Sequence, residues 1–221
     1  MGTPTQMREQ WIDEIKDPNA LMVVAHPDDE TIFAGGLILS FNANWTIVCC
    51  IHEQEERRSE FHCACDFLSE QSGNLIKSEY LGFSSAQAVQ MLPEKLLDYR
   101  DDFDIVFTHN SMGEYGHEHH KLVHHMVVAN IFHENTWLFI SPGSWNVNQD
   151  VLRSKNEDGN RILKIKPEIL ELKIRTFHEC HKSQAMTYGY DPKTKKLRET
   201  QLKDTLKWEF ESGLEEYTFF K

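Results

Sequence analysis

Basic residues are scarce in this chain of 221 residues. Its 23 lysines and arginines are outnumbered by 35 aspartates and glutamates, so the formal net charge is −12. A chain this acidic repels the phosphates of nucleic acids and of anionic lipid surfaces, and we expect neither as a partner. Long apolar runs are also missing, since a membrane-spanning helix needs roughly 18 such residues. Because residues 1–15 are polar and unlike a signal peptide, we expect a soluble, cytoplasmic protein without an integral membrane segment.

Cysteine is also sparse, and its spacing fits no common framework. The five cysteines are an odd number, and the pairs at positions 49–50 and 63–65 match neither a zinc ribbon nor the disulfide pattern of a small secreted domain. A chain of this length can bury a sizeable core without disulfides or a structural metal. We therefore expect buried or half-buried reduced thiols.

The sequence does contain apolar runs of strand length that alternate with longer segments of helical period. Expected strands cover residues 20–25, 45–51, 75–80, 104–108 and 136–141, and expected helices cover residues 31–41, 57–68, 86–99 and 119–133. Such alternation is typical of crossover units. It predicts a Rossmann-like three-layer α/β fold around a mostly parallel sheet.

We expect residues 1–221 to form one domain, because no repeat and no long linker divides the chain. The core should cover residues 19–141, and a C-terminal extension should cover residues 142–221. Within that extension, the pattern predicts an added strand over residues 161–165 and a helix over 167–181, with proline near its first turn. The tail from Asp191 is charged, and its pattern predicts no element.

Two clusters of metal-binding residue types follow expected strands. Residues 26–30 read HPDDE after the first strand, and residues 109–120 read HNSMGEYGHEHH after the fourth. Ligands of open α/β sheets bind outside the carboxyl ends of the strands. Imidazole nitrogens and carboxylate oxygens suit zinc, and three protein ligands leave one position open for catalysis. If one of Asp28 and Asp29 binds a metal, the other can act as a general base.

Each cluster also has a structural interpretation. Asp28 or Asp29 could cap the next helix, and the histidines could form a solvated helix face. Zincin helices and zinc deaminases are excluded, since Lys121 breaks the HExxH spacing and no P-C-x-x-C segment exists. Gly35 and Gly36 fit close helix packing better than phosphate binding. The two clusters together, each directly after a strand of one sheet, favour a metal site.

Four segments resemble one known family. The sequence AHPDDE at residues 25–30, followed by Gly35 and Gly36, resembles the signature of the PIG-L/LmbE family of zinc-dependent N-acetylglucosamine-type deacetylases. GHEHH at residues 116–120 resembles the family's H-x-x-H motif, RRSE at 57–60 its R-x-x-E motif, and HKSQ at 181–184 a recurring C-terminal segment. The likeness runs from residue 25 to about residue 184.

The resemblance implies a role for each matching residue. One zinc ion per chain, replaceable by other divalent transition metals, would be bound by His26, Asp29 and His120. The catalytic residues would be Asp28 as the base, with Tyr115 and His117 polarising the amide carbonyl, steadying the oxyanion or protonating the leaving amine. Arg57 would bind substrate hydroxyls or phosphate, the alternative being a surface ion pair with Glu60. His119 departs from the aspartate that the family often carries there, so the group that orients the neighbouring histidines is left open.

The function implied by the resemblance is zinc-dependent removal of an N-acetyl group from an N-acetylated amino sugar in a glycoside, nucleotide sugar or glycolipid precursor. A soluble bacterial-type member is the nearer likeness. The alternatives are a metal-dependent phosphoesterase and a non-catalytic metal- or sugar-binding module. We expect the loops at residues 82–85 and 141–151 to contact the rest of the substrate. The sequence determines neither that part of the substrate nor the oligomeric state.

Overall fold

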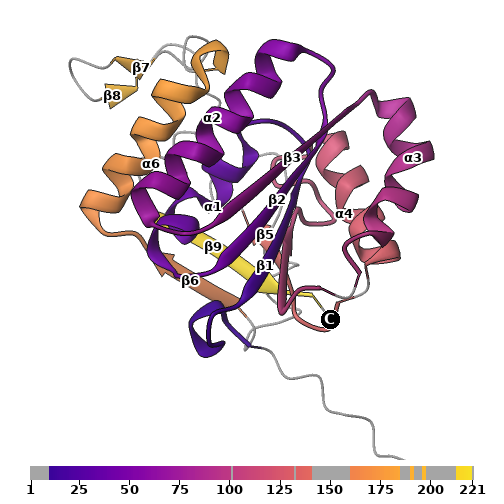
Figure 1. Cartoon of the computed structure of the whole chain (residues 1–221), viewed down its shortest axis with the longest axis horizontal. Helices are drawn as coiled ribbons and strands as arrows, with labels where there is room; N and C mark the ends of the chain where they lie inside the picture. The colour runs from indigo at the N-terminus through magenta and orange to yellow at the C-terminus, as the bar shows by residue number, and fades with distance from the viewer. Residues whose placement is uncertain are drawn as a thin grey trace, which may run out of the picture.

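The centre of the molecule is a seven-stranded sheet with the order β3-β2-β1-β4-β5-β9-β6 (Figure 1). The computed structural model describes residues 10–100, 102–131, 133–140, 160–184, 190–191, 196–197 and 213–220. The strands are β1 (Asn19–Val24), β2 (Asn44–Ile51), β3 (Ile76–Phe83), β4 (Ile105–Thr108), β5 (Thr136–Ile140), β6 (Asn160–Lys164) and β9 (Leu214–Phe219). The first five pair in parallel, and β9 is antiparallel to both β5 and β6. The expected mostly parallel sheet is confirmed.

Helices cover both faces of this sheet. They are α1 (Asp29–Ser40), α2 (Glu55–Ser72), α3 (Ser85–Leu97), α4 (Glu118–Asn130) and α6 (Pro167–Cys180), with a 3-10 turn η1 (Ile12–Glu14) and a two-stranded ribbon of β7 (Tyr190–Asp191) and β8 (Lys196–Leu197). Figure 1 shows α1, α2 and α6 on one face and α3 and α4 on the other, and the contacts between these helices agree. The three-layer α/β architecture is confirmed.

Alternating side chains of the central strands build two apolar cores. Met22 and Ile47 belong to the core beneath α1, α2 and α6, whereas Leu21, Val23 and Val48 belong to the core beneath α3 and α4. Strands buried on both faces read as continuous apolar runs rather than as an alternation of apolar and polar residues. This is why the central strands β1, β2 and β4 could be predicted from the sequence.

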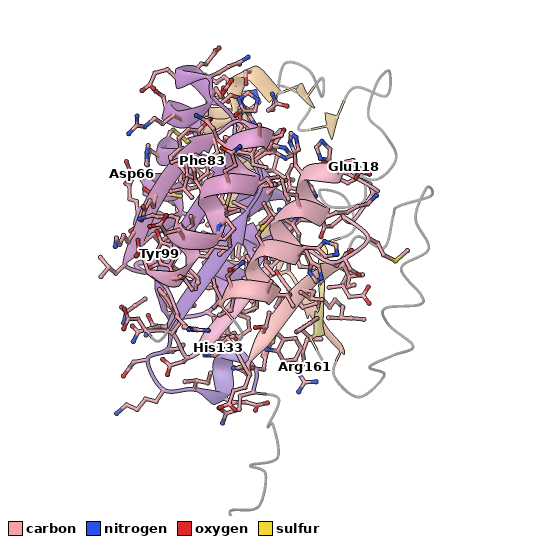
Figure 2. The ribbon with its side chains drawn as sticks, turned by 90° about the vertical axis from the view of Figure 1, so that its right-hand side faces the viewer. Asp66, Phe83, Tyr99, Glu118, His133 and Arg161 are labelled. Atoms are coloured by element: carbon pink, nitrogen blue, oxygen red, sulfur yellow. A yellow bond between two sulfur atoms is a disulfide. The ribbon has the colours of Figure 1, made fainter. Side chains whose placement is uncertain are left out.

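The strand order places the candidate residues at one edge of the sheet. From β1 the chain continues to β2 and β3 on one side, while β4 and β5 lie on the other. Ligands of such sheets bind at the switch point between these halves, outside the carboxyl ends of the strands. His26 follows β1 and His109 follows β4, so both clusters reach the switch point. Figure 2 shows this edge, where Phe83 and Glu118 lie, opposite the edge marked by His133.

The C-terminal segment holds a strand that the sequence did not predict. The tail from Asp191 had no assigned element, yet β9 lies between β5 and β6 and pairs with both. The strand was not predicted because its charged residues do not fit the apolar pattern of a buried strand, yet Glu215 and Glu216 are buried there. The strand and helix expected around residues 161–181 are confirmed as β6 and α6. The expected substrate loop at residues 141–151 lies outside the described residues.

Two cysteines form a disulfide, contrary to the expectation of five reduced thiols. Cys63 of α2 and Cys180 of α6 are bonded, with 5.4 Å between their Cα atoms and a sequence separation of 117. Cys49, Cys50 and Cys65 are free and buried. The expectation was wrong because packing of α6 on α2 creates the pair, and sequence spacing does not report such a long-range contact. Among the described helices, none combines the length and the apolar character needed to cross a membrane.

Candidate metal centre and catalytic residues

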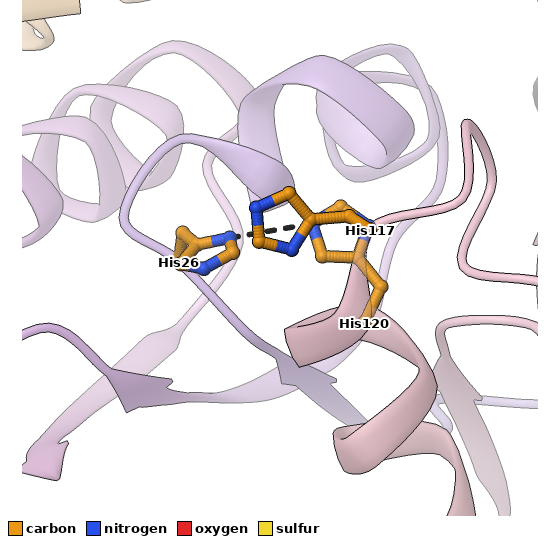
Figure 3. A group of neighbouring side chains, drawn as sticks. All are labelled: His26, His117 and His120. Carbon is orange, nitrogen blue, oxygen red and sulfur yellow. Dashed lines mark hydrogen bonds between the residues drawn. The ribbon is translucent and has the colours of Figure 1, made fainter. Parts of the chain in front are cut away.

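Three side chains expected as metal ligands converge at the switch point. His26 lies in the turn between β1 and α1, Asp29 begins α1, and His120 lies in the first turn of α4. His26 Nδ1 is 3.2 Å from His120 Nε2 and 3.5 Å from Asp29 Oδ2, and His120 Nε2 is 3.4 Å from Asp29 Oδ1. Figure 3 shows the rings of His26 and His120 facing each other, with His117 beside them.

The spacing of these donors fits a divalent metal ion. Ligands about 2.0–2.2 Å from a tetrahedral zinc ion lie about 3.3–3.6 Å from one another. His120 Nε2 lies in or next to that range from both His26 Nδ1, at 3.2 Å, and Asp29 Oδ1, at 3.4 Å, and His26 Nδ1 lies 3.5 Å from the other oxygen of the same carboxylate, Asp29 Oδ2. His120 and Asp29 are buried, and His26 is nearly so, with a side chain that is 15% exposed. Two imidazole nitrogens and one carboxylate are also a donor set that zinc prefers.

Glu114 orients His120, and sequence reasoning missed it. The wholly buried Glu114 carboxylate lies 2.5 Å from His120 Nδ1 and accepts the backbone N–H of Asn110. Although burial alone would raise the pKa of Glu114, its contacts with His109 and His120 lower that pKa to about 2. The carboxylate therefore holds a proton on His120 Nδ1 and leaves Nε2 free to bind a metal. Its one sequence signal was being the only carboxylate between His109 and His117.

His109 is a second buried histidine that the sequence reasoning left without a role. Its Nε2 lies 3.3 Å from Asp29 Oδ2, so Asp29, His109 and His120 form another possible ligand group. However, His109 Nε2 accepts the backbone N–H of Ala25, and its Nδ1 lies 3.0 Å from Glu114. Both ring nitrogens thus already have protein partners. We interpret His109 as a support for Asp29 and Glu114.

His117 and Tyr115 lie beside the three expected ligands. His117 is the N-cap of α4, and its Nδ1 accepts the backbone N–H of His119. Burial and the neighbouring His120 and His26 lower the pKa of His117 to about 3. A neutral ring that accepts at Nδ1 carries its proton on Nε2, where it can donate a hydrogen bond. The half-buried Tyr115 ring packs edge-on against His117 and His120.

Asp28 occupies the N-cap position of α1 without capping the helix. Its side chain makes no cap hydrogen bond, and its backbone has φ +141°, a conformation that costs energy outside glycine. The Oδ2 atom instead accepts from Arg57 Nη2 at 3.0 Å. Burial and the adjacent charge of Asp29 raise the pKa of Asp28 to about 6, although Arg57 opposes the rise. The capping interpretation is therefore wrong for Asp28.

Comparison with known families agrees with the residues at this site. Residues 21–131, half of the chain, match the PIG-L family, described as GlcNAc-PI de-N-acetylase. The chain belongs to the PIG-L family. The matched range contains the expected metal ligands, the expected catalytic residues and Arg57, whereas the expected substrate loop at residues 141–151 lies outside it.

One curated protein is similar to part of this PIG-L chain. Uncharacterized protein L374 of Acanthamoeba polyphaga mimivirus is 30% identical over 127 residues, which cover 47% of this chain and 53% of that protein. The chain thus spans about half the length of this curated relative.

Two solved structures share its fold. A deacetylase triple mutant from the teicoplanin biosynthetic pathway has a TM-score of 0.61 at 17% identity, covering 91% of this chain and 96% of that one. The A40926 pseudoaglycone deacetylase Dbv21 has a TM-score of 0.55 at 14% identity, covering 79% and 86%.

Arg57 lies inside this PIG-L domain rather than at its surface. Its side chain is only 4% exposed and donates to Glu60 Oε2 at 2.8 Å and to Asp28, as well as to the carbonyl oxygen of Pro27. The alternative of a surface ion pair with Glu60 is wrong, because the pair exists but is buried. The role of Arg57 in binding substrate stays a prediction. In the structure, its guanidinium holds Asp28.

The HKSQ segment, which directly follows α6, contacts two carboxylates that in turn contact Arg57 and Asp28. Ser183 donates its backbone N–H to Glu60 Oε1 at 2.6 Å and its hydroxyl to Glu60 Oε2 at 2.8 Å. His181 is wholly buried, and its Nε2 lies 2.8 Å from Glu30 Oε1. Glu30 in turn accepts the backbone N–H of Asp28. The end of α6 is thus connected to Asp28 through two carboxylates.

Proposed function

We propose that this PIG-L chain is a zinc-dependent N-deacetylase that releases acetate from an N-acetylated amino sugar in a glycoside, nucleotide sugar or glycolipid precursor. The observation that carries the proposal is the separation of two adjacent carboxylates. Asp29 faces His26 and His120 at ligand spacing, whereas Asp28 is held away from them by Arg57 and has a pKa raised to about 6. One group is suited to bind metal, and the other is suited to accept a proton.

One zinc ion per chain would be held by His26, Asp29 and His120, and other divalent transition metals can substitute. A zinc ion bound there supplies a Lewis acid for the acetyl carbonyl and lowers the pKa of a water molecule. The described residues form two possible ligand groups, His26–His117–His120 and Asp29–His109–His120. Both include His120, which supports a single ion rather than a two-metal centre. His109 and Glu114 hold Asp29 and His120 in place, so the site needs little rearrangement.

Asp28 would take the proton of the attacking water. A base is most effective when its pKa lies near the working pH, and the buried Asp28 meets this condition better than an exposed aspartate. The proton that Asp28 accepts is needed again by the leaving amine. His117, which is neutral with a donor at Nε2, and the Tyr115 hydroxyl would stabilise the negative charge on the carbonyl oxygen.

The expected partner is a small N-acetyl amino sugar conjugate, with no nucleic acid. We also propose that residues 1–221 act as one domain, since β6 and β9 of the C-terminal extension join the central sheet. The cytoplasmic location stays a proposal. The disulfide argues against a cytoplasmic location, because such bonds persist mainly in oxidising compartments.

The test is release of free amine and acetate from defined substrates. Zinc-loaded protein would be incubated with N-acetylglucosamine, its glycosides and its nucleotide sugars, with and without a chelator. We expect amine release that stops on chelation and returns with zinc, and that His120→Ala abolishes together with metal binding. The proposal is overturned if the zinc-loaded protein releases no amine from any of these substrates, or releases phosphate instead.

A further inference from the structure

His119 connects the expected metal ligand His26 to a residue of a third element. His119 Nδ1 lies 2.8 Å from His26 Nε2, and His119 Nε2 lies 2.7 Å from the hydroxyl oxygen of Ser85. His26 follows β1, His119 lies in the first turn of α4, and Ser85 is the first residue of α3. Both nitrogens of the His119 ring therefore have a partner in the protein.

The hydrogen positions in this series follow from the position of His26. Its Nδ1 faces His120 Nε2 and Asp29 at 3.2 and 3.5 Å, so Nδ1 must be free of a proton to bind a metal there. A neutral imidazole then carries its proton on Nε2 and donates it to His119 Nδ1. The same rule places the proton of His119 on Nε2, from which it donates to Ser85.

The two imidazole ligands differ in the group that supports them. His120 is oriented by the buried carboxylate of Glu114, whereas His26 is oriented by a neutral ring. A carboxylate behind a metal-bound histidine increases the basicity of that ligand, and a neutral acceptor does so less. The chain has histidine where its family often has aspartate, and the ring of this histidine contacts both His26 and Ser85.

We infer that His119 is a positioning residue that holds His26 in its Nε2–H tautomer with Nδ1 toward the metal, and that Ser85 anchors His119. The inference rests on the proposed function for the metal itself. The hydrogen-bond series, in contrast, consists of protein groups alone.

The first experiment compares zinc affinities by competition with a chelator. His119→Ala removes the acceptor, and we expect a 10–100-fold loss of affinity, the range found when such supporting groups are removed. His119→Asn keeps a neutral acceptor near the position of Nδ1, so most of the affinity should return. Ser85→Ala should give a smaller loss than His119→Ala. His125→Ala is the matched control, because His125 is exposed on the same helix and its described contacts are with the carbonyl oxygen of Lys121 and the ring of His124, not with His26 or His119.

The second experiment reads the tautomer without metal. Nitrogen chemical shifts of His26 in the metal-free protein should show one form, protonated at Nε2, and His119→Ala should convert it to a mixture while His119→Asn keeps it. Equal zinc affinities for wild type and His119→Ala overturn the inference. A His26 tautomer that does not change in His119→Ala also overturns it. If the wild type binds no zinc, the proposed function fails, and the tautomer measurement still decides the inference by itself.

Discussion

At the scale of single residues, Asp28 and Asp29 are neighbours whose pKa values move in opposite directions. Burial and the charge of Asp29 raise the pKa of Asp28 to about 6. For Asp29, burial is outweighed by His120 and His109, which hold its pKa well below the usual range. Paired groups whose environments separate their pKa values in this way commonly divide the acid and base roles of an active site.

The first prediction concerns this pair. Asp28→Asn removes the proton acceptor but keeps the size of the side chain, so kcat should fall roughly 10²–10⁴-fold while zinc content is unchanged. Asp29→Asn should instead lose zinc. Amine release and metal analysis on both variants measure these effects. Near-normal turnover by Asp28→Asn would remove Asp28 as the base, and loss of zinc in that variant would exchange the two roles.

The second prediction compares neighbouring arginines. Arg57→Ala leaves the buried Asp28 and Glu60 without their cation, so it should lower the free energy of unfolding by about 3–5 kcal/mol. Arg58→Ala breaks an exposed pair with Glu55 and should cost no more than about 1 kcal/mol. Urea unfolding of both variants measures the difference. Similar losses in the two variants would contradict the buried role of Arg57.

The third prediction is a pH dependence of stability. Burial lowers the pKa of His124 from 6.5 to about 4, so the unfolded chain binds a proton there that the folded chain excludes. This contribution is fully present above pH 6.5 and is lost as pH falls from 6.5 through 4, by at most roughly 3 kcal/mol. Urea unfolding at several pH values, without metal, should show a weaker pH dependence in His124→Asn. His125→Asn should keep most of the pH dependence, because burial is the largest cause of the lowered pKa of His124 and His125 is a smaller one. If His124→Asn behaves as wild type, His124 does not contribute.

At the scale of elements, α1 carries the site and is held from behind by β9. The carboxylate of Glu215 accepts the backbone N–H groups of Gly36 and Leu37 at 2.7 and 2.8 Å. Lys173 of α6 pairs with the same carboxylate at 2.7 Å, and both side chains are wholly buried. The close packing expected of Gly35 and Gly36 is confirmed, and it lets the C-terminal strand approach the helix that begins with Asp29.

The fourth prediction tests this approach. A Cβ atom on Gly36 would lie 2.5 Å from Ile165 Cδ1 and 2.9 Å from Glu215 Oε1. Gly36→Ala should therefore destabilise the protein by about 1–3 kcal/mol, although alanine favours helices more than glycine does. Gly35→Ala meets only the flexible chain of Lys173, at 3.1 Å, and should cost less. Melting temperatures of the two variants measure these losses, and we expect the larger decrease for Gly36→Ala. A higher melting temperature for Gly36→Ala than for the wild type would contradict the packing at Gly36.

At the scale of the whole molecule, the Cys63–Cys180 disulfide connects two helices on one face of the sheet. Cys63 lies one turn after Glu60, and Cys180 directly precedes His181. The bond therefore ties the helix that carries Arg57 to the segment that supports Arg57. A cross-link that closes so long a loop constrains mainly the unfolded chain.

The fifth prediction follows from this bond. The purified protein, unfolded without reductant, should expose three reactive thiols, and five after reduction, because two of the five cysteines are bonded. Removing the bond with Cys63→Ser and Cys180→Ser should cost about 2–5 kcal/mol in unfolding free energy. Reductant should destabilise the wild type and leave the double variant unchanged. Five reactive thiols without reductant would contradict the bond.

The sequence by itself determined the fold class and the place of the site. Strands buried on both faces and helices with one apolar face have local periodicities, and these are readable without a structure. The carboxyl ends of parallel strands lie at the same edge of a sheet. The segment HPDDE after one strand and the histidine-rich segment after another were therefore expected to lie close together.

Only the tertiary structure decided how these residues are held. Four features depend on which elements and side chains face each other in the folded chain. They are the contact of Glu114 with His120, the burial of Arg57, the connection from His119 to Ser85 and the pairing of strand β9. The partners of Arg57 and of Glu215 include residues more than 100 positions away in the chain. Local patterns record periodicity and turn chemistry, whereas such distant pairs follow from the packing of complete elements against one another, which no short window of sequence contains.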